Sequence, residues 1–336
     1  MRRNHTIGTC ALVFALTLTA TAMQQQAAAE TSTVYGRDHA VARHFNGQPF
    51  VTHSTPNFRL HSTHAEWAYD AGDLLEYTHN RFYDIWGDLA EPLDQPLTWV
   101  GFTHRGDFHR YAHAEDNVDM SWSDGYYSAR TNRVVVVHPT LRNTESGPRN
   151  RDSDSEVHAQ DNSETEHEHE HTPSAVVDTG QITHEAAHQM AFNSGLQRRG
   201  VMYPLWVSEG LGTNFETNAE EEFGPDVDNP NRRRQLLRAW NGGRVMNIED
   251  LLVLTRVPRS PGQSISEVYA QCWSFFQFLY IHHQPQLKQY LATLARQDKG
   301  QRRNRTLRNE FVHAFGNVQA IEEEFHAFIR TDVARR

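Results

Sequence analysis

Hydrophobic positions divide the chain into a mixed N-terminal half and a helical C-terminal half. Strand-like runs occur over 50–60, where Pro56 interrupts the run, and over 97–102. Apolar residues recur at helical spacing over 64–89, and a shorter helix is expected over 105–112. This order predicts an α+β fold in which helices pack on a small mixed or antiparallel sheet.

Two β-prone runs flank a polar turn later in the first half. The run Asp124–Ser128 precedes the turn Arg130–Asn132, and Arg133–His138 follows it with four consecutive valines. Such runs around a turn predict a β-hairpin. The valines predict that the second strand is well buried.

Downstream of Glu216 the pattern is almost wholly helical. Helices are expected over 230–240, 247–255, 264–283, 285–297, 304–315 and 318–333. Cys272 lies in an apolar run of the third of these helices, so we expect a buried, unreactive thiol.

The segment 143–172 interrupts this organisation. It is rich in Asp, Glu, Ser, Asn and His and has almost no large apolar side chain. It cannot bury enough surface to offset the entropy of ordering it. We therefore expect a disordered acidic, His-rich insertion within one domain over 49–336. The polar residues 30–48 lack periodicity and are expected to form a loose leader.

The first 29 residues resemble a secretory signal peptide. Arg2 and Arg3 supply positive charge, an apolar run spans 7–20, and Ala27–Ala29 offers small residues for cleavage. The apolar run is shorter than the roughly 20 residues that a membrane-spanning helix needs. We expect an exported chain, periplasmic or extracellular, without stable membrane insertion after cleavage, and the alternative is that the segment is retained as an anchor.

Composition narrows the classes of partner. The formal net charge is −10 at pH 7, and removal of residues 1–29 makes it −12, because two of the 32 Lys and Arg are lost against 42 Asp and Glu. This charge gives no electrostatic argument for nucleic-acid binding. Signal removal also leaves Cys272 as the sole cysteine, which excludes an internal disulfide.

Histidine is the compositional outlier, with 21 residues, and one pair has metal-ligand spacing. In a helix, His184 and His188 lie one turn apart on the same face, with Glu185 beside them. This HExxH spacing suits two imidazole ligands of one divalent metal and a carboxylate that can reach a bound water. Apolar and small residues over 176–192 predict such a helix, with Gly195 as its stop.

A second HExxH match, His167–His171, lies within the insertion and has no apolar face. We interpret it as part of a solvated tract, with weak metal collection as the alternative. Either Ser174 or Asp178 can cap the helix of the first match, and Asp178 has Gln181 three positions on, as in a capping box.

A catalytic zinc takes three protein ligands and keeps one open position. Glu209 lies about twenty residues after His188, on an expected helix whose first turn suits Pro204. An acid on or beside an apolar face is costly unless it is paired or binds a metal. Gly210 and Gly212 are expected to let this helix approach the first one closely.

HExxH followed by Trp-x-x-Glu-Gly at 206–210 resembles the gluzincin metallopeptidases, the clan of thermolysin and the membrane-alanyl aminopeptidases. The context is most similar to little-characterised exported bacterial peptidase-like proteins of that clan. The resemblance is strong over 184–210 and looser from about 50 to 329. It implies a zincin-like fold with one catalytic Zn²⁺, and it does not account for the insertion at 143–172.

By this resemblance, His184, His188 and Glu209 are the zinc ligands and Glu185 is the general base. Tyr269 is similar to the tyrosine that donates to the oxyanion in aminopeptidase-like members, and the alternative is a tyrosine at the start of a core helix. Other expectations concern the site's surroundings. His282 and His283 are either further donors or surface histidines. Asn214 or Glu216 is expected to orient one of the histidine ligands. The hairpin at 125–127 and 134–137 either offers an edge to the substrate or belongs to a covered sheet.

The function implied is that of an exported zinc peptidase, a hydrolase whose partners are peptide or protein substrates. One alternative is a catalytically degenerate zinc-binding relative that acts in binding. Another is a metal-sequestering protein that depends on the His-rich insertion. An intact Glu185 favours the peptidase, because a protein that only binds metal has no chemical need for this base.

Overall fold

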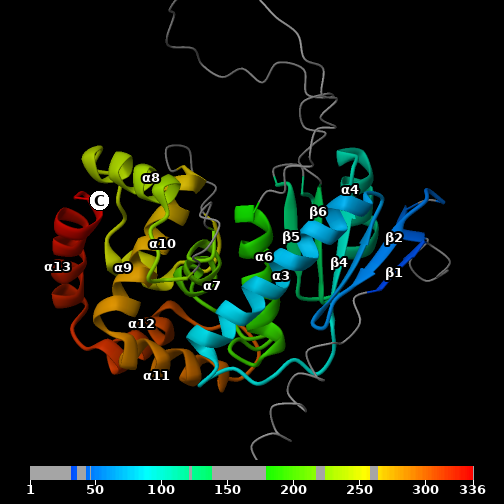
Figure 1. Ribbon diagram of the computed structural model, residues 1–336. Coiled ribbons are helices and arrows are strands. Elements are labelled where there is room, and N and C mark those ends of the chain that lie inside the picture. The colour runs from blue at the N-terminus through cyan, green and yellow to red at the C-terminus, as the bar shows by residue number, and fades with distance from the viewer. Residues whose placement is uncertain are drawn as a thin grey trace, which may run out of the picture.

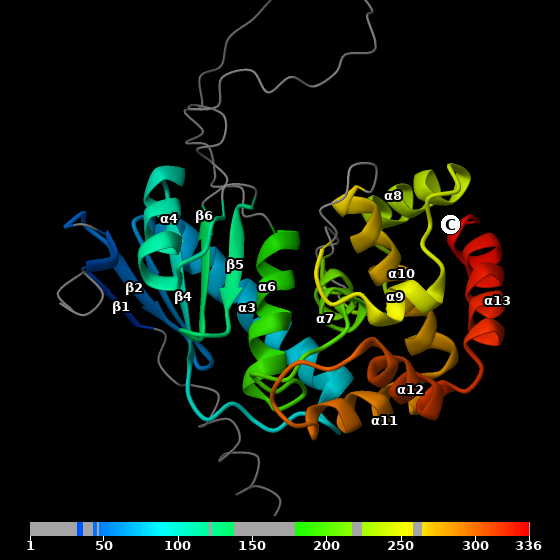
Figure 2. The ribbon, with the colours of Figure 1, turned by 180° about the vertical axis from the view of Figure 1, so that it is seen from behind.

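The structure is a computed structural model, and it describes residues 32–35, 43–45, 47–120, 123–137, 179–216, 224–257 and 264–335. A half built on a sheet and a helical half lie side by side, with helix α6 (Thr179–Asn193) between them (Figure 1, Figure 2). The expected α+β class is confirmed. The signal peptide over 1–29 and the insertion over 143–172 lie outside the described residues.

The described residues form a six-stranded mixed sheet with the order β1-β2-β3-β4-β6-β5. Its central strands β3, β4 and β6 are parallel, and the outer pairs are antiparallel. The expected hairpin is present as β5 and β6. Of these two strands, β5 is at an edge of the sheet, whereas β6 lies between β4 and β5. The strands are β1 (Ser32–Tyr35), β2 (Val51–Ser54), β3 (Phe58–Ser62), β4 (Leu97–Phe102), β5 (Gly125–Ser128) and β6 (Arg133–Val137).

The prediction of a loose leader over 30–48 is wrong for two of its stretches. β1 pairs antiparallel with β2, and Arg43–Phe45 forms a short 3-10 helix. Phe45 is 2% exposed and stacks on Phe50, with ring centroids 5.0 Å apart. These elements are stabilised by contacts with residues distant in sequence, which a polar run without periodicity does not reveal.

The four valines of β6 face two different layers of side chains. Val134 and Val136 pack in the cluster that contains α6 and α3 (Ala65–Trp86), whereas Val135 and Val137 pack with α4 (Arg105–Tyr111). Successive residues of a strand point to opposite faces, and helices cover both. The prediction of a well-buried strand is therefore confirmed, since all four valines are at most 5% exposed.

Helix α3 lies close to the sheet at a glycine. A Cβ atom at Gly101 of β4 would lie 2.3 Å from Cζ3 of Trp67, a fully buried residue of α3. Further along α3, the Glu76 carboxylate accepts hydrogen bonds from Thr55 Oγ1 (2.6 Å) and from the backbone and side-chain nitrogens of Asn57 (2.8 and 2.7 Å). These bonds tie the β2–β3 turn to the helix.

Buried polar contacts join α6 to the sheet. Gln189 Oε1 accepts from Trp99 Nε1 at 2.8 Å, and Gln189 Nε2 donates to the carbonyl oxygens of Thr98 (3.2 Å) and Asn132 (3.1 Å). The helix is buried on nearly every side, because small residues let both halves approach it. These residues are Ala186, Ala187 and Ala191, all 0% exposed.

The helices expected downstream of Glu216 are all present. Helix α7 precedes them and is joined to them by Trp206, which is 0% exposed and stacks on Tyr290 with ring centroids 5.7 Å apart. No helix of the described residues is long and apolar enough to span a membrane. The helices are α7 (Leu205–Thr213), α8 (Pro230–Asn241), α9 (Ile248–Val253), α10 (Ile265–His282), α11 (Gln284–Ala295), α12 (Asn304–Phe315) and α13 (Val318–Phe328).

The contact between Trp67 and Gly101 can be tested by substitution. Gly101→Ala should lower the free energy of unfolding by about 1–3 kcal/mol, because an added methyl group overpacks the core. Gly106→Ala, in α4, is the matched control. Its Cβ would meet only Arg110 Nη1, at 3.7 Å, so it should be neutral or slightly stabilising. Urea unfolding measures both, and equal effects would contradict this account.

Candidate metal centre

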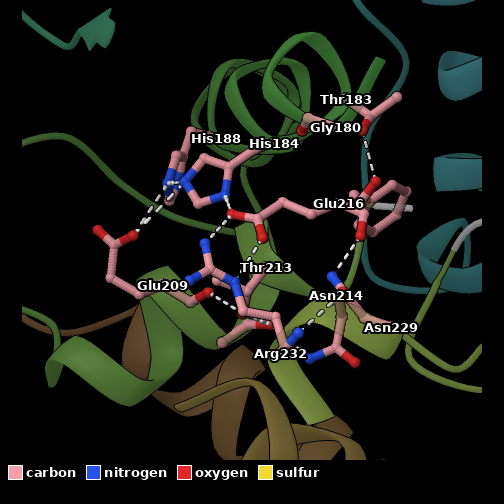
Figure 3. Close-up of polar contacts among 12 residues, drawn as sticks. Gly180, Thr183, His184, His188, Glu209, Thr213, Asn214, Glu216, Asn229 and Arg232 are labelled. Carbon is pink, nitrogen blue, oxygen red and sulfur yellow. Dashed lines mark hydrogen bonds and ion pairs between the residues drawn. The ribbon is translucent and has the colours of Figure 1, made fainter. Parts of the chain in front are cut away.

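His184 and His188 of α6 meet Glu209 of α7 (Figure 3). The two Nε2 atoms are 3.0 Å apart, and Glu209 Oε2 lies 3.5 Å from His184 Nε2 and 3.8 Å from His188 Nε2. One ligand atom from each residue lies within 4.8 Å of the other two. The three residues that the sequence singles out as ligands thus form a possible metal-binding triad.

Helix α7 approaches the imidazoles at Gly212, and this approach leaves room for an ion. A Cβ atom at Gly212 would lie 2.9 Å from the Nε2 atoms of both His184 and His188. Glycine therefore keeps a side chain out of the space that these nitrogens face. Two imidazole nitrogens and one carboxylate oxygen form a donor set that zinc uses, so the residues present fit a divalent cation.

The second glycine of α7 serves a different contact. A Cβ atom at Gly210 would lie 2.7 Å from Cβ of Phe276 and 2.9 Å from the carbonyl oxygen of Cys272, both in α10. The prediction that both glycines bring α7 to α6 is therefore wrong for Gly210. Residues two positions apart on a helix point to different sides, so one glycine faces each neighbouring helix.

Glu216 is the carboxylate that orients His184 (Figure 3). Its Oε1 atom lies 2.7 Å from His184 Nδ1. Arg232 donates to the same carboxylate, from Nε to Oε2 (2.6 Å) and from Nη2 to Oε1 (2.7 Å). A proton held on Nδ1 leaves the Nε2 lone pair for a metal. The other candidate, Asn214, instead donates to the carbonyl oxygens of Gly210 and Trp273.

In the triad, attraction between the carboxylates and the imidazoles outweighs the effect of burial on their pKa values. Burial alone would raise the pKa of Glu209, but the hydrogen bonds and charges of His184 and His188 outweigh it and hold that pKa far below its usual range. Burial would lower the pKa of His184, yet Glu209 and Glu216 raise it well above its usual value. The same negative field stabilises a divalent cation beside these groups.

Glu185 and Tyr269 line one cleft of about 860 Å³ together with the triad. Burial raises the pKa of Glu185, although the charges of His184 and His188 oppose the shift. Burial also raises the pKa of Tyr269, and the charges of Glu209 and Glu185 add to the increase. The phenol of Tyr269 therefore keeps its proton and can act as a hydrogen-bond donor.

The other candidate donors lie at the opposite end of α10 and do not line this cleft. His283 Nε2 lies 3.0 Å from Glu324 Oε2, and the ring of His282 packs edge-on against Phe328. These contacts belong to the packing of α13 against α10. Cys272 is fully buried in the same helix, and burial raises its pKa, as expected for an unreactive thiol.

The edge strand β5 borders the cleft. Val137 N–H donates to the carbonyl oxygen of Asp124 at 2.8 Å, so the alternation of an antiparallel pair directs the backbone groups of Gly125 and Tyr127 away from β6. Both residues line the cleft, and the backbone N–H of Tyr127 is hydrogen-bonded to Glu185. Of the two predicted edge runs, only β5 can meet a ligand there.

A family model described as a protein of unknown function (DUF1570) matches residues 178–299. The matched region contains the triad, Glu185 and Tyr269. The comparison with curated proteins found no match.

Glu216→Gln should weaken binding of Zn²⁺ at the triad by about 10–100-fold, because an uncharged amide holds the Nδ1 proton of His184 less strongly. The measurement is a competition titration against a chromophoric chelator, on a chain that lacks 153–172 so that the His-rich tract does not contribute. Glu249→Gln is the control, since Glu249 receives a similar pair of bonds from Arg308 at the surface. Equal losses in the two variants would refute the orienting role.

Proposed function

We propose that the protein is an exported zinc-dependent peptidase of gluzincin type, a hydrolase of peptide bonds. The observation that carries the proposal is the gathering of His184, His188, Glu209, Glu185 and Tyr269 in one cleft. The first three would hold the zinc. When bound, the ion supplies Lewis-acid chemistry, because it acidifies water and polarises a carbonyl group.

Glu185 is the proton carrier in this proposal. Its carboxylate takes a proton from the attacking water and then delivers that proton to the nitrogen of the departing amine. The increase of its pKa by burial suits both steps, since a base whose pKa is nearer the working pH accepts and releases a proton more readily. The hydrogen bond from the Tyr127 backbone fixes its position beside β5.

Tyr269 and β5 act on the substrate itself. The protonated phenol of Tyr269 donates to the oxygen of the scissile carbonyl as negative charge develops there. The carbonyl oxygen of Tyr127, which faces the cleft, accepts a hydrogen bond from the backbone of an extended peptide, as sheet edges do in peptide recognition. The substrate is thereby aligned next to Glu185.

A degenerate zinc-binding relative or a metal-sequestering protein remains the competing proposal. The arrangement of Glu185 favours the peptidase. A half-buried acid that binds no metal is costly to retain, and Glu185 lines the same cleft as the triad.

Glu185→Gln should lower hydrolysis by about 10²–10⁴-fold while zinc stoichiometry and thermal stability stay close to those of the parent. The substitution keeps the size of the side chain and removes the proton acceptor. The assay is cleavage of a mixed peptide library with mass-spectrometric detection, and a chelator should abolish the activity of the parent chain. Unchanged turnover in the variant would exclude Glu185 as the base.

Tyr269→Phe should lower kcat by about 100-fold with little change in KM, because the hydroxyl group acts mainly in the transition state. Tyr290→Phe is the matched control, since Tyr290 is buried in the helical half and its hydroxyl has no hydrogen-bond partner there. The control should keep full turnover. An effect of less than a few-fold for Tyr269→Phe would assign Tyr269 to the core alone.

A further inference from the structure

Helix α8 carries four arginines, and carboxylates of the described residues neutralise two of them. Arg232 is paired with Glu216, and Arg233 Nη1 lies 2.8 Å from Asp228 Oδ2. Arg234 donates to the amide oxygen of Asn231 and has no carboxylate partner in the part of the chain that the structure describes. Arg238 is also without a carboxylate partner among the described residues, and both side chains are exposed.

The two unneutralised arginines lie on the face of α8 that borders the cleft. Asn231, Arg234, Gln235 and Arg238 all line the cleft, and their spacing of three, four and seven residues places them on one side of a helix. Leu236 and Ala239, on an adjacent side of the helix, are buried in the core. The packing of α8 therefore fixes which guanidinium groups face the cleft.

Arg234 and Arg238 are left in excess when the charges of the cleft are counted. Among the acids that line it, Asp124 is paired with Arg105, and Glu216 is paired with Arg232. The remaining carboxylates, Glu185 and Glu209, would be balanced by a divalent cation bound at the triad. Among the described residues that line the cleft, two positive charges then remain on α8, although the mature chain carries a net charge of −12.

We propose that Arg234 and Arg238 determine specificity by binding an Asp or Glu side chain of the substrate, so that the cleft selects acidic peptides. This inference rests on the proposed peptidase function. Guanidinium groups form paired, charge-assisted hydrogen bonds with carboxylates. Because the whole chain is acidic, a local cluster of positive charge such as Arg234 and Arg238 is needed to attract an acidic ligand to the cleft.

The test uses the full-length Glu185→Gln variant loaded with Zn²⁺, so that peptides bind without being consumed. The probes are labelled, blocked hexapeptides that carry one Glu at each position in turn, and the same series with Gln. Fluorescence anisotropy should show that Glu at one position strengthens binding by about tenfold over Gln. The preference should decrease as salt screens the charges.

Adding Arg234→Gln and Arg238→Gln should reduce that preference to less than about twofold. The matched control adds Arg303→Gln and Arg305→Gln, which remove the same charge from exposed residues outside the cleft, and it should keep the preference. The inference is overturned if no position prefers Glu, or if the preference survives loss of Arg234 and Arg238.

Hydrolysis of the same peptides by the parent chain separates the two proposals. Equal cleavage of the Glu and Gln series would overturn the specificity inference and leave the peptidase standing. No cleavage of any peptide, combined with arginine-dependent binding of the Glu series, would overturn the peptidase and keep the acidic-ligand cleft.

Discussion

Burial of α6 between the two halves is the constraint on which the rest of the structure depends. A helix enclosed on nearly all sides cannot leave its polar side chains unpaired. Gln189 meets this requirement against β4, and Thr183 Oγ1 does so by donating to the carbonyl oxygen of Phe215 at 2.5 Å. His184 and His188 meet it against carboxylates or a cation. The enclosure that rigidifies the helix therefore also positions the possible metal-binding triad.

The sequence predicts well those elements in which the pattern of apolar residues along the element itself shows which side is buried. Helix α3 has an apolar stripe at helical spacing, and the valines of β6 form a run with no polar residue. Strand order is not predicted in this way, because β6 takes its place between β5 and β4 by pairing in parallel with β4. β1 is likewise fixed by β2 about twenty residues away. Such pairings depend on tertiary contacts that a local pattern does not contain.

The same distinction applies to the site. His184, Glu185 and His188 are predictable because one helical turn sets their relation, and Glu209 because an acid in an apolar segment needs a partner. Glu216 and Asn214 could not be ranked from the sequence, since only the end of α7 decides which of them reaches His184. The contact of Arg232 with Glu216 is not predictable from the sequence. Arg232 lies sixteen residues beyond Glu216, and nothing in its neighbourhood marks it as a partner.

The bare Cα of Gly212 also has a use in recognising related proteins. A residue without a side chain is required at position 212, because a Cβ atom there would meet the two imidazoles. A sequence pattern for this geometry therefore contains HExxH followed by Glu-x-x-Gly, here at positions 209 and 212. Chains that carry the two histidines and the acid but a larger residue at that fourth position would need a different spacing between the two helices. A side chain that is missing can therefore be as diagnostic of this geometry as the ligands themselves.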